Sequence, residues 1–250
     1  MTRTRARALP ETCCARLWLW PGTALYAGPS LRLDTHSGSV SCLAVGADAP
    51  FTIRTARHGE REVRSALIGP RLPHRLVAHG ERMVFCYLDP ASARERACRA
   101  RMRHRDGDLA HHHADEAALA SGPDDAAAER WLDLACPRPE PMPDERIAVA
   151  TTRLREHPAS SAAELAAAAG LSVSRFLHLF RACTGTSVRR YRLWARMLLA
   201  GTLIAEGHDL TAASAGAGFA SPSHFSDSFR AMFGLAPSTL LGTGVEIRPG

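Results

Sequence analysis

The sequence predicts an α+β fold of two domains, an N-terminal antiparallel β-barrel with following helices and a C-terminal all-α domain. Short apolar runs broken by glycine and proline fill residues 16–90, which is typical of antiparallel sheets. A proline-rich spacer follows, and a helical pattern is written twice between residues 161 and 240. We therefore expect a domain at 1–136, a linker at 137–143, a domain at 144–241 and a tail at 242–250.

Length and composition are those of a globular protein with room for two cores. The 250 residues are 46% hydrophobic and 22% charged. The formal net charge of +6 and the isoelectric point near 9.3 favour a polyanionic partner. The chain has arginine and no lysine. Arginine suits bidentate contacts with phosphate and guanine, although a coding bias toward arginine gives the same composition.

No stretch of the sequence has the pattern of a signal peptide or a membrane span. The basic stretch Arg3–Arg7 is followed by Pro10, Glu11 and Arg16 rather than by an apolar run. No run approaches the ~20 apolar residues of a transmembrane helix. We therefore expect a cytoplasmic protein. The seven cysteines include no C-x-x-C pair, so they predict neither a disulfide framework nor a zinc knuckle.

The first domain is expected to contain short strands separated by turns such as Pro21-Gly22 and Gly69-Pro70. The strands are expected at Leu17–Trp20, Ala24–Tyr26, Val40–Val45, Phe51–Ile53, Val63–Ile68, Leu76–Val77 and Met83–Leu88. An arginine-rich helix is expected at Ala91–Arg103, a polar loop around Arg105-Asp106-Gly107, and a helical pair at His113–Ala120 and Asp124–Leu134.

Capping residues mark the helices of the second domain. Asp144 can cap one helix, and Ser160 or Ser161 starts the next, with Glu164 three residues after Ser161 in a capping-box arrangement. Ser172 caps a third. Ser187–Glu206 then runs without proline, which makes a helix roughly 30 Å long at ~1.5 Å per residue. Within it, only Gly201 weakens the helical pattern.

The second domain repeats itself at an offset of 49 residues. The matched pairs are Ser172 and Ser221, Ser174 and Ser223, Phe176 and Phe225, Phe180 and Phe229, Arg181 and Arg230, Ala182 and Ala231, and Gly185 and Gly234. Each copy follows a small-residue helix that ends in glycine, at Ala162–Gly170 and Thr211–Gly218. A short helix, a tight turn and an amphipathic second helix form a helix-turn-helix, whose second helix can enter the major groove of DNA.

The charge pattern also favours DNA binding. Leu165–Ala205 contains six arginines and no acidic residue, which is a phosphate-binding pattern. The roughly 30 Å helix between the two units is close to the ~34 Å that separates equivalent major-groove positions. Both units could therefore read successive grooves. A solvated arginine face on an ordinary helical bundle is the alternative, and the repeat argues against it.

Residues 144–240 resemble the tandem helix-turn-helix domain of the AraC/XylS family of bacterial transcription regulators. The resemblance is carried by Leu165-Ala166, Gly170-Leu171-Ser172, Phe176, Phe180-Arg181, Thr184-Gly185, Gly218-Phe219, Ser221-Pro222-Ser223-His224-Phe225, Phe229-Arg230, Phe233-Gly234 and Pro237-Ser238. It implies a sequence-specific activator or repressor rather than an enzyme. The implied partners are operator DNA, a small-molecule effector, a second copy of the chain and, for an activator, RNA polymerase, with no cofactor.

The resemblance also implies which side chains meet DNA. Base contacts are expected from Ser174, Leu177, His178, Pro222, Ser223 and Asp227. Phosphate contacts or helix caps are expected from Ser172, Arg175, Arg181, Arg189, Arg190, Ser221, His224 and Arg230. The second copy departs from the family pattern at Ala213, Ser214 and Leu240-Leu241, and it carries Asp209 and Asp227 against Arg230 alone. We therefore expect the first unit to supply most of the DNA affinity.

In this family the N-terminal half is often a cupin-like barrel that binds an effector or forms a dimer, and residues 16–90 resemble one loosely. Gly69–His74 resembles a late cupin turn and Asp34–His36 an early one. A cupin-type metalloenzyme is the alternative function, but it needs several histidines and a carboxylate around a metal. The early turn has one histidine, so we expect no metal and assign His36 and His74 to a structural role or an effector pocket. A ligand-free barrel that only dimerises, through 91–103 or 124–134, is a further alternative.

Two more clusters could act as sensors. His104 and His111–His113 lie among acidic residues and could coordinate a divalent metal. Adjacent histidines on a regular helix cannot all face one ion, so a solvated linker is favoured. Cys13-Cys14 could oxidise, but vicinal disulfides are strained. Cys42 and Cys86 lie in strand patterns, where we expect them to pack as small hydrophobes.

Overall fold

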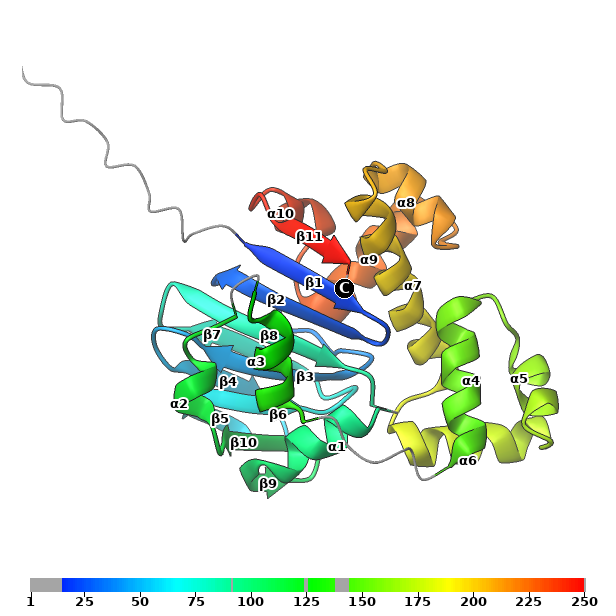
Figure 1. The fold of residues 1–250 in the computed structure, drawn as a ribbon, viewed down its shortest axis with the longest axis horizontal. Coiled ribbons are helices and arrows are strands. Elements are labelled where there is room, and N and C mark those ends of the chain that lie inside the picture. The colour runs from blue at the N-terminus through cyan, green and yellow to red at the C-terminus, as the bar shows by residue number, and fades with distance from the viewer. Residues whose placement is uncertain (1–14, 91, 124–125, 138–143, 250) are drawn as a thin grey trace, which may run out of the picture.

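The computed structural model describes residues 15–90, 92–123, 126–137 and 144–249 (Figure 1). It is an α+β fold with a sheet-rich N-terminal part and a helical C-terminal part. An eight-stranded sheet has the order β11-β1-β2-β8-β3-β6-β10-β9, and a three-stranded sheet has the order β5-β4-β7. The strands are β1 Arg16–Trp20, β2 Thr23–Pro29, β3 Ser41–Gly46, β4 Phe51–Thr55, β5 Gly59–Val63, β6 Ser65–Ile68, β7 His74–Ala78, β8 Arg82–Leu88, β9 Met102–Asp106, β10 Leu109–His113 and β11 Glu246–Pro249.

The apolar runs of the sequence predicted the inner strands correctly, but four strands were missed: β5, β9, β10 and β11. β5 has the sequence GEREV and only Val63 of it is buried, so no apolar run marked it. β9 and β10 form a hairpin that contains arginines and histidines. The helix expected at Ala91–Arg103 therefore stops early, and Met102 begins a strand instead.

Both faces of the large sheet are buried. The outer face is covered by α1 (Ala93–Ala100), α2 (Glu116–Leu119) and α3 (Ala128–Ala135) (Figure 1). Trp18, Leu25 and Val84 of the sheet pack there with Trp131 and Leu132 of α3. The inner face packs against the small sheet and the C-terminal helices. The pair of helices expected at 113–134 is thus present in shorter form, as α2 and α3.

The C-terminal helices are α4 Glu145–Glu156, α5 Ala162–Ala168, α6 Val173–Thr184, α7 Val188–Ala205, α8 Leu210–Gly216, α9 Pro222–Phe233 and α10 Pro237–Leu241. Of these, α4, α5, α6 and α9 begin at predicted caps. The side chains of Asp144, Ser161, Ser172, Ser187 and Ser221 each accept a hydrogen bond from a first-turn amide, and Ser161 and Glu164 complete a capping box. α7 has 18 residues, about 27 Å at the usual rise. Among the described residues, no helix has both the length and the apolar character of a membrane span.

The segment expected as a tail joins the sheet. β11 pairs with β1 in parallel, from Arg16 with Glu246 to Leu19 with Pro249. The backbone amide of Glu246 also donates to the carbonyl of Ala15, at 2.9 Å. The end of the helical part is therefore hydrogen-bonded to the edge of the N-terminal sheet, and the sequence had no strong strand signal to predict this.

Candidate nucleic-acid interface and interdomain cavity

Helix α6 presents the predicted base-reading residues on one exposed face. Phe176 and Phe180 are fully buried, and the 3.6-residue period of the helix puts Ser174, Leu177 and His178 on the opposite side. All three are exposed. Leu177 is 41% exposed, which is unusual for a large apolar side chain and provides a methyl-bearing surface suited to contact with thymine. The Ser172 hydroxyl is occupied as a cap, since it accepts from the amide of Arg175 at 3.3 Å.

Helix α9 has the same arrangement in the second unit. Phe225 is buried, whereas Pro222, Ser223 and Asp227 are exposed. Ser221 caps the helix by accepting from the amide of His224 at 3.1 Å. The His224 ring packs against Phe219 in an edge-to-face arrangement, and its Nδ1 accepts from the Ala220 amide at 3.4 Å. His224 is exposed but bound to its own turn, which makes it less available for a phosphate than the sequence suggested.

The arginines of the expected phosphate surface fall into two groups. Arg175, Arg181, Arg189 and Arg230 are exposed. Arg190 is half-buried, and its guanidinium donates to the Gly38 carbonyl and the Ser37 hydroxyl, each at 3.4 Å. Burial, together with the nearby charge of Arg71, lowers the pKa of Arg190. In this arrangement a loop of the N-terminal domain holds Arg190, a contact across about 150 residues that the sequence could not reveal.

A buried polar cluster joins the N-terminal domain to the first unit. Asp89, at the end of β8, is 2% exposed. Its Oδ2 accepts from Arg155 Nη1 of α4 at 2.8 Å and from the hydroxyl of Tyr191 of α7. Arg155 Nη1 also donates to the Tyr191 hydroxyl at 2.9 Å. Burial and the adjacent Asp89 carboxylate raise the pKa of Tyr191 well above its usual value, so the hydroxyl keeps its proton.

A loop of the N-terminal domain caps the end of α9. The last carbonyls of a helix have no partner within the helix. Here the Asp34 amide donates to the Gly234 carbonyl at 2.8 Å, and the Ser37 amide donates to the Ala231 carbonyl at 3.2 Å. Gly234 has φ +79°, and a Cβ at this position would lie 2.7 Å from the Asp34 carbonyl oxygen. Only glycine allows so close a contact.

The structure brings His36 and His74 together. They form an isolated antiparallel bridge, and their ring centroids are 4.3 Å apart. Each Nδ1 lies 2.8 Å from a backbone carbonyl, of Asp34 and of Leu72 respectively, so each ring is the Nδ1–H tautomer. Burial, and then the neighbouring His36, lower the pKa of His74 to about 4. Both rings lie beside the loop that caps α9, and neither lines the cavity described next.

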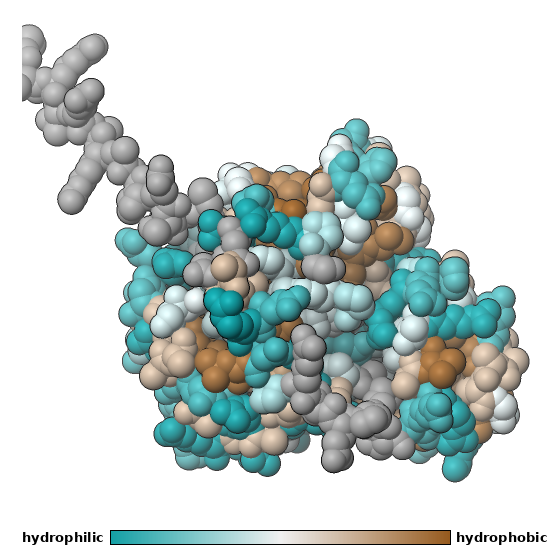
Figure 2. Space-filling view, in the orientation of Figure 1, coloured by the Kyte–Doolittle hydropathy of each residue, from teal (hydrophilic) through white to brown (hydrophobic). Residues whose placement is uncertain are grey.

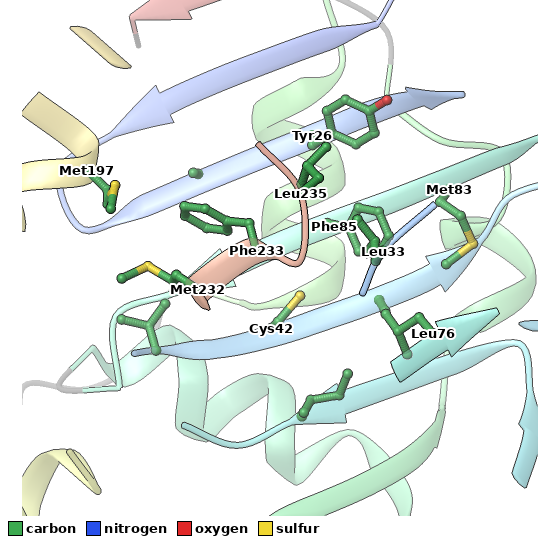
Figure 3. Close-up of a cluster of buried hydrophobic side chains, with 14 of the residues drawn as sticks. Tyr26, Leu33, Cys42, Leu76, Met83, Phe85, Met197, Met232, Phe233 and Leu235 are labelled. Carbon is green, nitrogen blue, oxygen red and sulfur yellow. The ribbon is translucent and has the colours of Figure 1, made fainter. Parts of the chain in front are cut away.

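An apolar cavity lies between the large sheet and the second unit. It contains about 840 Å³ of space free of protein atoms, part of which is open to solvent. Figure 3 shows Leu235, which follows α9, beside Tyr26, Leu33 and Phe85, whereas the ring of Phe233 points away from these three side chains. Apolar surface is visible where α7, α10 and β11 meet (Figure 2). The wall consists of Leu17, Leu19, Ala24, Tyr26, Leu31, Leu33, Phe85, Tyr87, Trp194, Met197, Leu198, Gly201, Ile204, Phe225, Phe229, Phe233, Leu235, Pro237, Leu240, Leu241 and Ile247.

Gly201 is the one sequence signal that could have indicated this interdomain packing. A Cβ at Gly201 would lie 2.9 Å from Leu19 Cδ1 of β1. A glycine inside a long helix costs about 1 kcal/mol relative to alanine, and close approach by another element is the usual compensation. The other wall residues look like ordinary core positions, and sequence reasoning did not single them out as a site.

The histidine cluster lies on the β9–β10 hairpin and not on a linker or helix. His104 and His111 are cross-strand partners, with ring centroids 4.9 Å apart. His113 points into the core, where its Nε2 lies 3.0 Å from the Ala135 carbonyl. Within the described part of the chain, no group of three or more histidine, cysteine or acidic side chains is arranged to hold a metal ion. Cys42 and Cys86 are buried in β3 and β8, as predicted, whereas Cys13, Cys14 and residues 138–143 of the expected linker lie outside the described residues.

Residues 165–242 match the sequence profile of a family described as a helix-turn-helix domain, of the AraC type. Three solved structures of ToxT from Vibrio cholerae are similar in fold. Apo ToxT K231A has a TM-score of 0.59 at 12% identity, over 89% of this chain and 97% of that one. ToxT with a bound unsaturated fatty acid has a TM-score of 0.56 at 11% sequence identity, over 88% of this chain and 94% of that one. ToxT bound to (E)-4-(8-methylnaphthalen-1-yl)but-3-enoic acid has a TM-score of 0.53 at 12% sequence identity, over 92% of this chain and 98% of that one. A search of curated proteins found no relative of this sequence.

Proposed function

We propose, from the premise that residues 165–242 form an AraC-type helix-turn-helix domain of a DNA-binding transcription regulator, that a small molecule in the interdomain cavity controls how the two units meet operator DNA. Helices α6 and α9 would read bases through Ser174, Leu177 and His178 and through Pro222, Ser223 and Asp227. We assign the chain no catalytic reaction, and its DNA partner favours a cytoplasmic location.

The cavity is the observation that carries this proposal. Its wall is built from β1, β2 and β8 on one side and from α7, α9 and α10 on the other. A ligand there would add apolar contacts between the sheet and the second unit, at roughly 25 cal/mol for each Å² of apolar surface buried. The ToxT structures with a fatty acid and with a naphthalenyl butenoic acid support a ligand-binding role for this fold.

The direction of control follows from Arg190. In the present arrangement the Ser37–Gly38 loop holds its guanidinium, so this arrangement withholds one phosphate contact from DNA. A ligand that stabilises this arrangement would therefore weaken operator binding. Because a phosphate contact contributes a modest electrostatic energy that salt screens, we expect the loss to be severalfold and larger at low ionic strength.

DNA recognition is tested with the full-length chain. Bound duplexes are selected from a random-sequence pool, and the dissociation constant of the enriched duplex is measured. The double variant Ser174→Ala, His178→Ala removes two predicted base contacts and is expected to lose about tenfold or more in affinity, at 1–3 kcal/mol per good contact. Arg130→Ala is the control, because Arg130 is exposed on α3 over the opposite face of the sheet. Equal losses in both variants would contradict the assignment of α6 as a reading helix.

Control by the cavity is tested by filling it from within. Ile204→Trp places a larger side chain on the wall, and we expect it to mimic a bound ligand and to weaken binding to the selected duplex about threefold or more. Val149→Trp adds the same bulk on α4, where Val149 is 55% exposed, and should leave DNA affinity unchanged. Unchanged or stronger DNA binding by Ile204→Trp would reject the proposed control while leaving the DNA-binding assignment intact.

A further inference from the structure

We propose that the ligand of the interdomain cavity is an uncharged, mainly hydrocarbon molecule that carries one hydrogen-bond acceptor, and that Trp194 Nε1 donates to this acceptor. This inference rests on the proposed function, since it assumes that the cavity takes a ligand. It adds the chemical class of that ligand.

The wall of the cavity offers no charge. None of its residues is an arginine, histidine, aspartate or glutamate. Its two tyrosines stay neutral, because burial raises the pKa of both Tyr26 and Tyr87. Burying a carboxylate or ammonium group without a partner costs several kcal/mol. An anionic or cationic head group inside this cavity would therefore lose more hydration free energy than contacts with the wall could supply.

The nearest cations in the sequence point elsewhere. Side chains alternate along a strand, so Leu17 and Leu19 of β1 face the cavity, whereas Arg16 and Trp18 face the other side, where Trp18 packs in the outer core. Arg32, between two wall leucines, is exposed. On α7, Arg196 lies beside the turn at Gly218, where a Cβ would be 3.6 Å from its Nε.

One residue of the wall has a buried hydrogen-bond donor without a partner among the described residues. The Tyr26 hydroxyl donates to the Pro29 carbonyl at 2.9 Å, and the Tyr87 hydroxyl is hydrogen-bonded to the Cys42 thiol. By contrast, Trp194 is 1% exposed and its Nε1 has no hydrogen-bond partner there. The indole N–H can only donate, and a buried donor without a partner is destabilising. A carbonyl, ether or hydroxyl oxygen on a ligand would remove this cost.

The shape of the wall favours a hydrocarbon body. Phe225, Phe229 and Phe233 line one side, and their ring centroids are 5.8 Å and 4.5 Å apart in succession. Phe85 and the leucines of β1 line the other side. Apolar walls with one or two fixed polar groups are the usual design of a small-molecule site, in which the apolar surface supplies affinity and the polar group sets orientation.

Three probes of equal chain length test the inference: 2-nonanone, which has an acceptor and no charge, nonane, which has neither, and nonanoate, which is anionic at pH 8. Binding to the full-length chain is measured by equilibrium partition and gas chromatography. We expect 2-nonanone to bind about tenfold or more tightly than nonanoate. Trp194→Phe should lower the affinity for 2-nonanone about fivefold, roughly 1 kcal/mol, and change nonane binding less than about twofold.

Trp20→Phe is the matched control, because Trp20 lies outside the wall of this cavity, and it should change neither affinity. Nonane binding by Trp194→Phe also verifies that the variant keeps its cavity. Tighter binding of nonanoate than of 2-nonanone, or a Trp194→Phe variant that binds both neutral probes as the wild type does, would overturn the inference. If 2-nonanone binds as expected but leaves operator affinity unchanged, the ligand chemistry stands and the proposed control of DNA binding fails.

Discussion

The two helix-turn-helix units share a sequence pattern, but their repeated phenylalanines are buried in different hydrophobic cores. In the first unit, Phe176 and Phe180 pack with Leu154 of α4 and Tyr191 of α7, in a core whose buried members, among the described residues, all belong to α4–α7. In the second unit, Phe225 and Phe233 belong to the same cluster as Tyr26 and Phe85 of the large sheet. The first unit therefore has a core of its own, and the second completes its core with the N-terminal domain.

The polar links between the domains show the same contrast. The first unit is joined to the N-terminal domain by the buried cluster of Asp89, Arg155 and Tyr191 and by the hydrogen bonds of Arg190. The second unit contacts the N-terminal domain through the apolar side chains around the cavity and through the backbone hydrogen bonds that cap α9. An apolar ligand can therefore act directly on the second unit, whereas changes of charge at Asp89 act on the first.

Truncation of one core phenylalanine in each unit gives the largest expected difference. Phe180→Ala and Phe225→Ala should each cost about 3–5 kcal/mol, because both side chains are 2% exposed or less. Phe180→Ala should destabilise α4–α6 and leave the sheet protected, whereas Phe225→Ala should also raise hydrogen exchange in β1, β2 and β8. Hydrogen exchange resolved by mass spectrometry makes the comparison. Equal loss of sheet protection in both variants would show that the first unit has no separate core.

Lowering the pH should weaken the contact between the second unit and the N-terminal domain before it affects the first unit. The pKa of His74 falls from 6.5 to about 4 in the folded state, so the unfolded chain binds the proton more readily. The stability from neutral His74 is fully present above about pH 6.5 and is lost as the pH falls toward 4, on the order of 3 kcal/mol in total. The end of α9 is capped by the loop beside His36. Protection of α9 against exchange, relative to the intrinsic rate at each pH, should therefore fall more than that of α6 as the pH is lowered from 7.5 to 5.

His74→Gln removes this titration and should flatten the pH dependence of the melting temperature. His208→Gln is the control, because His208 is exposed. A wild-type slope in His74→Gln would mean that another group causes the acid sensitivity.

The sequence predicted what depends on local patterns. Capping residues gave the starts of α4, α5, α6 and α9, because a Ser or Asp side chain satisfies amides within its own first turn. Apolar runs gave the inner strands. The buried faces of α6 and α9 followed from the four-residue spacing of their phenylalanines. Each of these features is determined by residues within a few positions of one another.

The sequence could not predict what depends on distant pairing. β11 is a strand only because β1 offers it an unpaired edge, and β5 is stabilised by β4 although most of its side chains are exposed. His36 and His74, the expected effector residues, lie next to each other. They do not line the interdomain cavity, whose wall consists largely of leucines and phenylalanines that resemble ordinary core. Periodicity reports that a side chain is buried and not which element buries it.

Asp89→Asn tests the polar link to the first unit. It keeps the shape of the side chain but removes the charge that faces Arg155, and we expect a loss of about 2 kcal/mol, since the partly buried Arg155 guanidinium is left without its counter-ion. The loss should appear as faster exchange in α4 and the first half of α7, with α9 unaffected. Asp133→Asn is the control, because its ion pair with Arg94 is more exposed, and it should cost less than about 1 kcal/mol. Equal effects on α4 and α9 would mean that the two units are not linked separately.

The smallest expected effect is the difference in DNA affinity lost when the same arginine is removed from each unit. Arg181 and Arg230 occupy the same position of the repeat, both are exposed, and each lies in the last turn of its helix. Arg181→Ala should weaken binding to the selected duplex about tenfold, roughly 1.4 kcal/mol, and Arg230→Ala about twofold to threefold, because Asp227 one turn before Arg230 already opposes phosphate in the second unit. Each variant should also reduce the slope of log affinity against log salt by about one phosphate contact. The comparison is made at two salt concentrations, with Arg130→Ala as the charge-matched control. Equal losses for Arg181→Ala and Arg230→Ala would refute the ranking of the first unit as the main source of affinity.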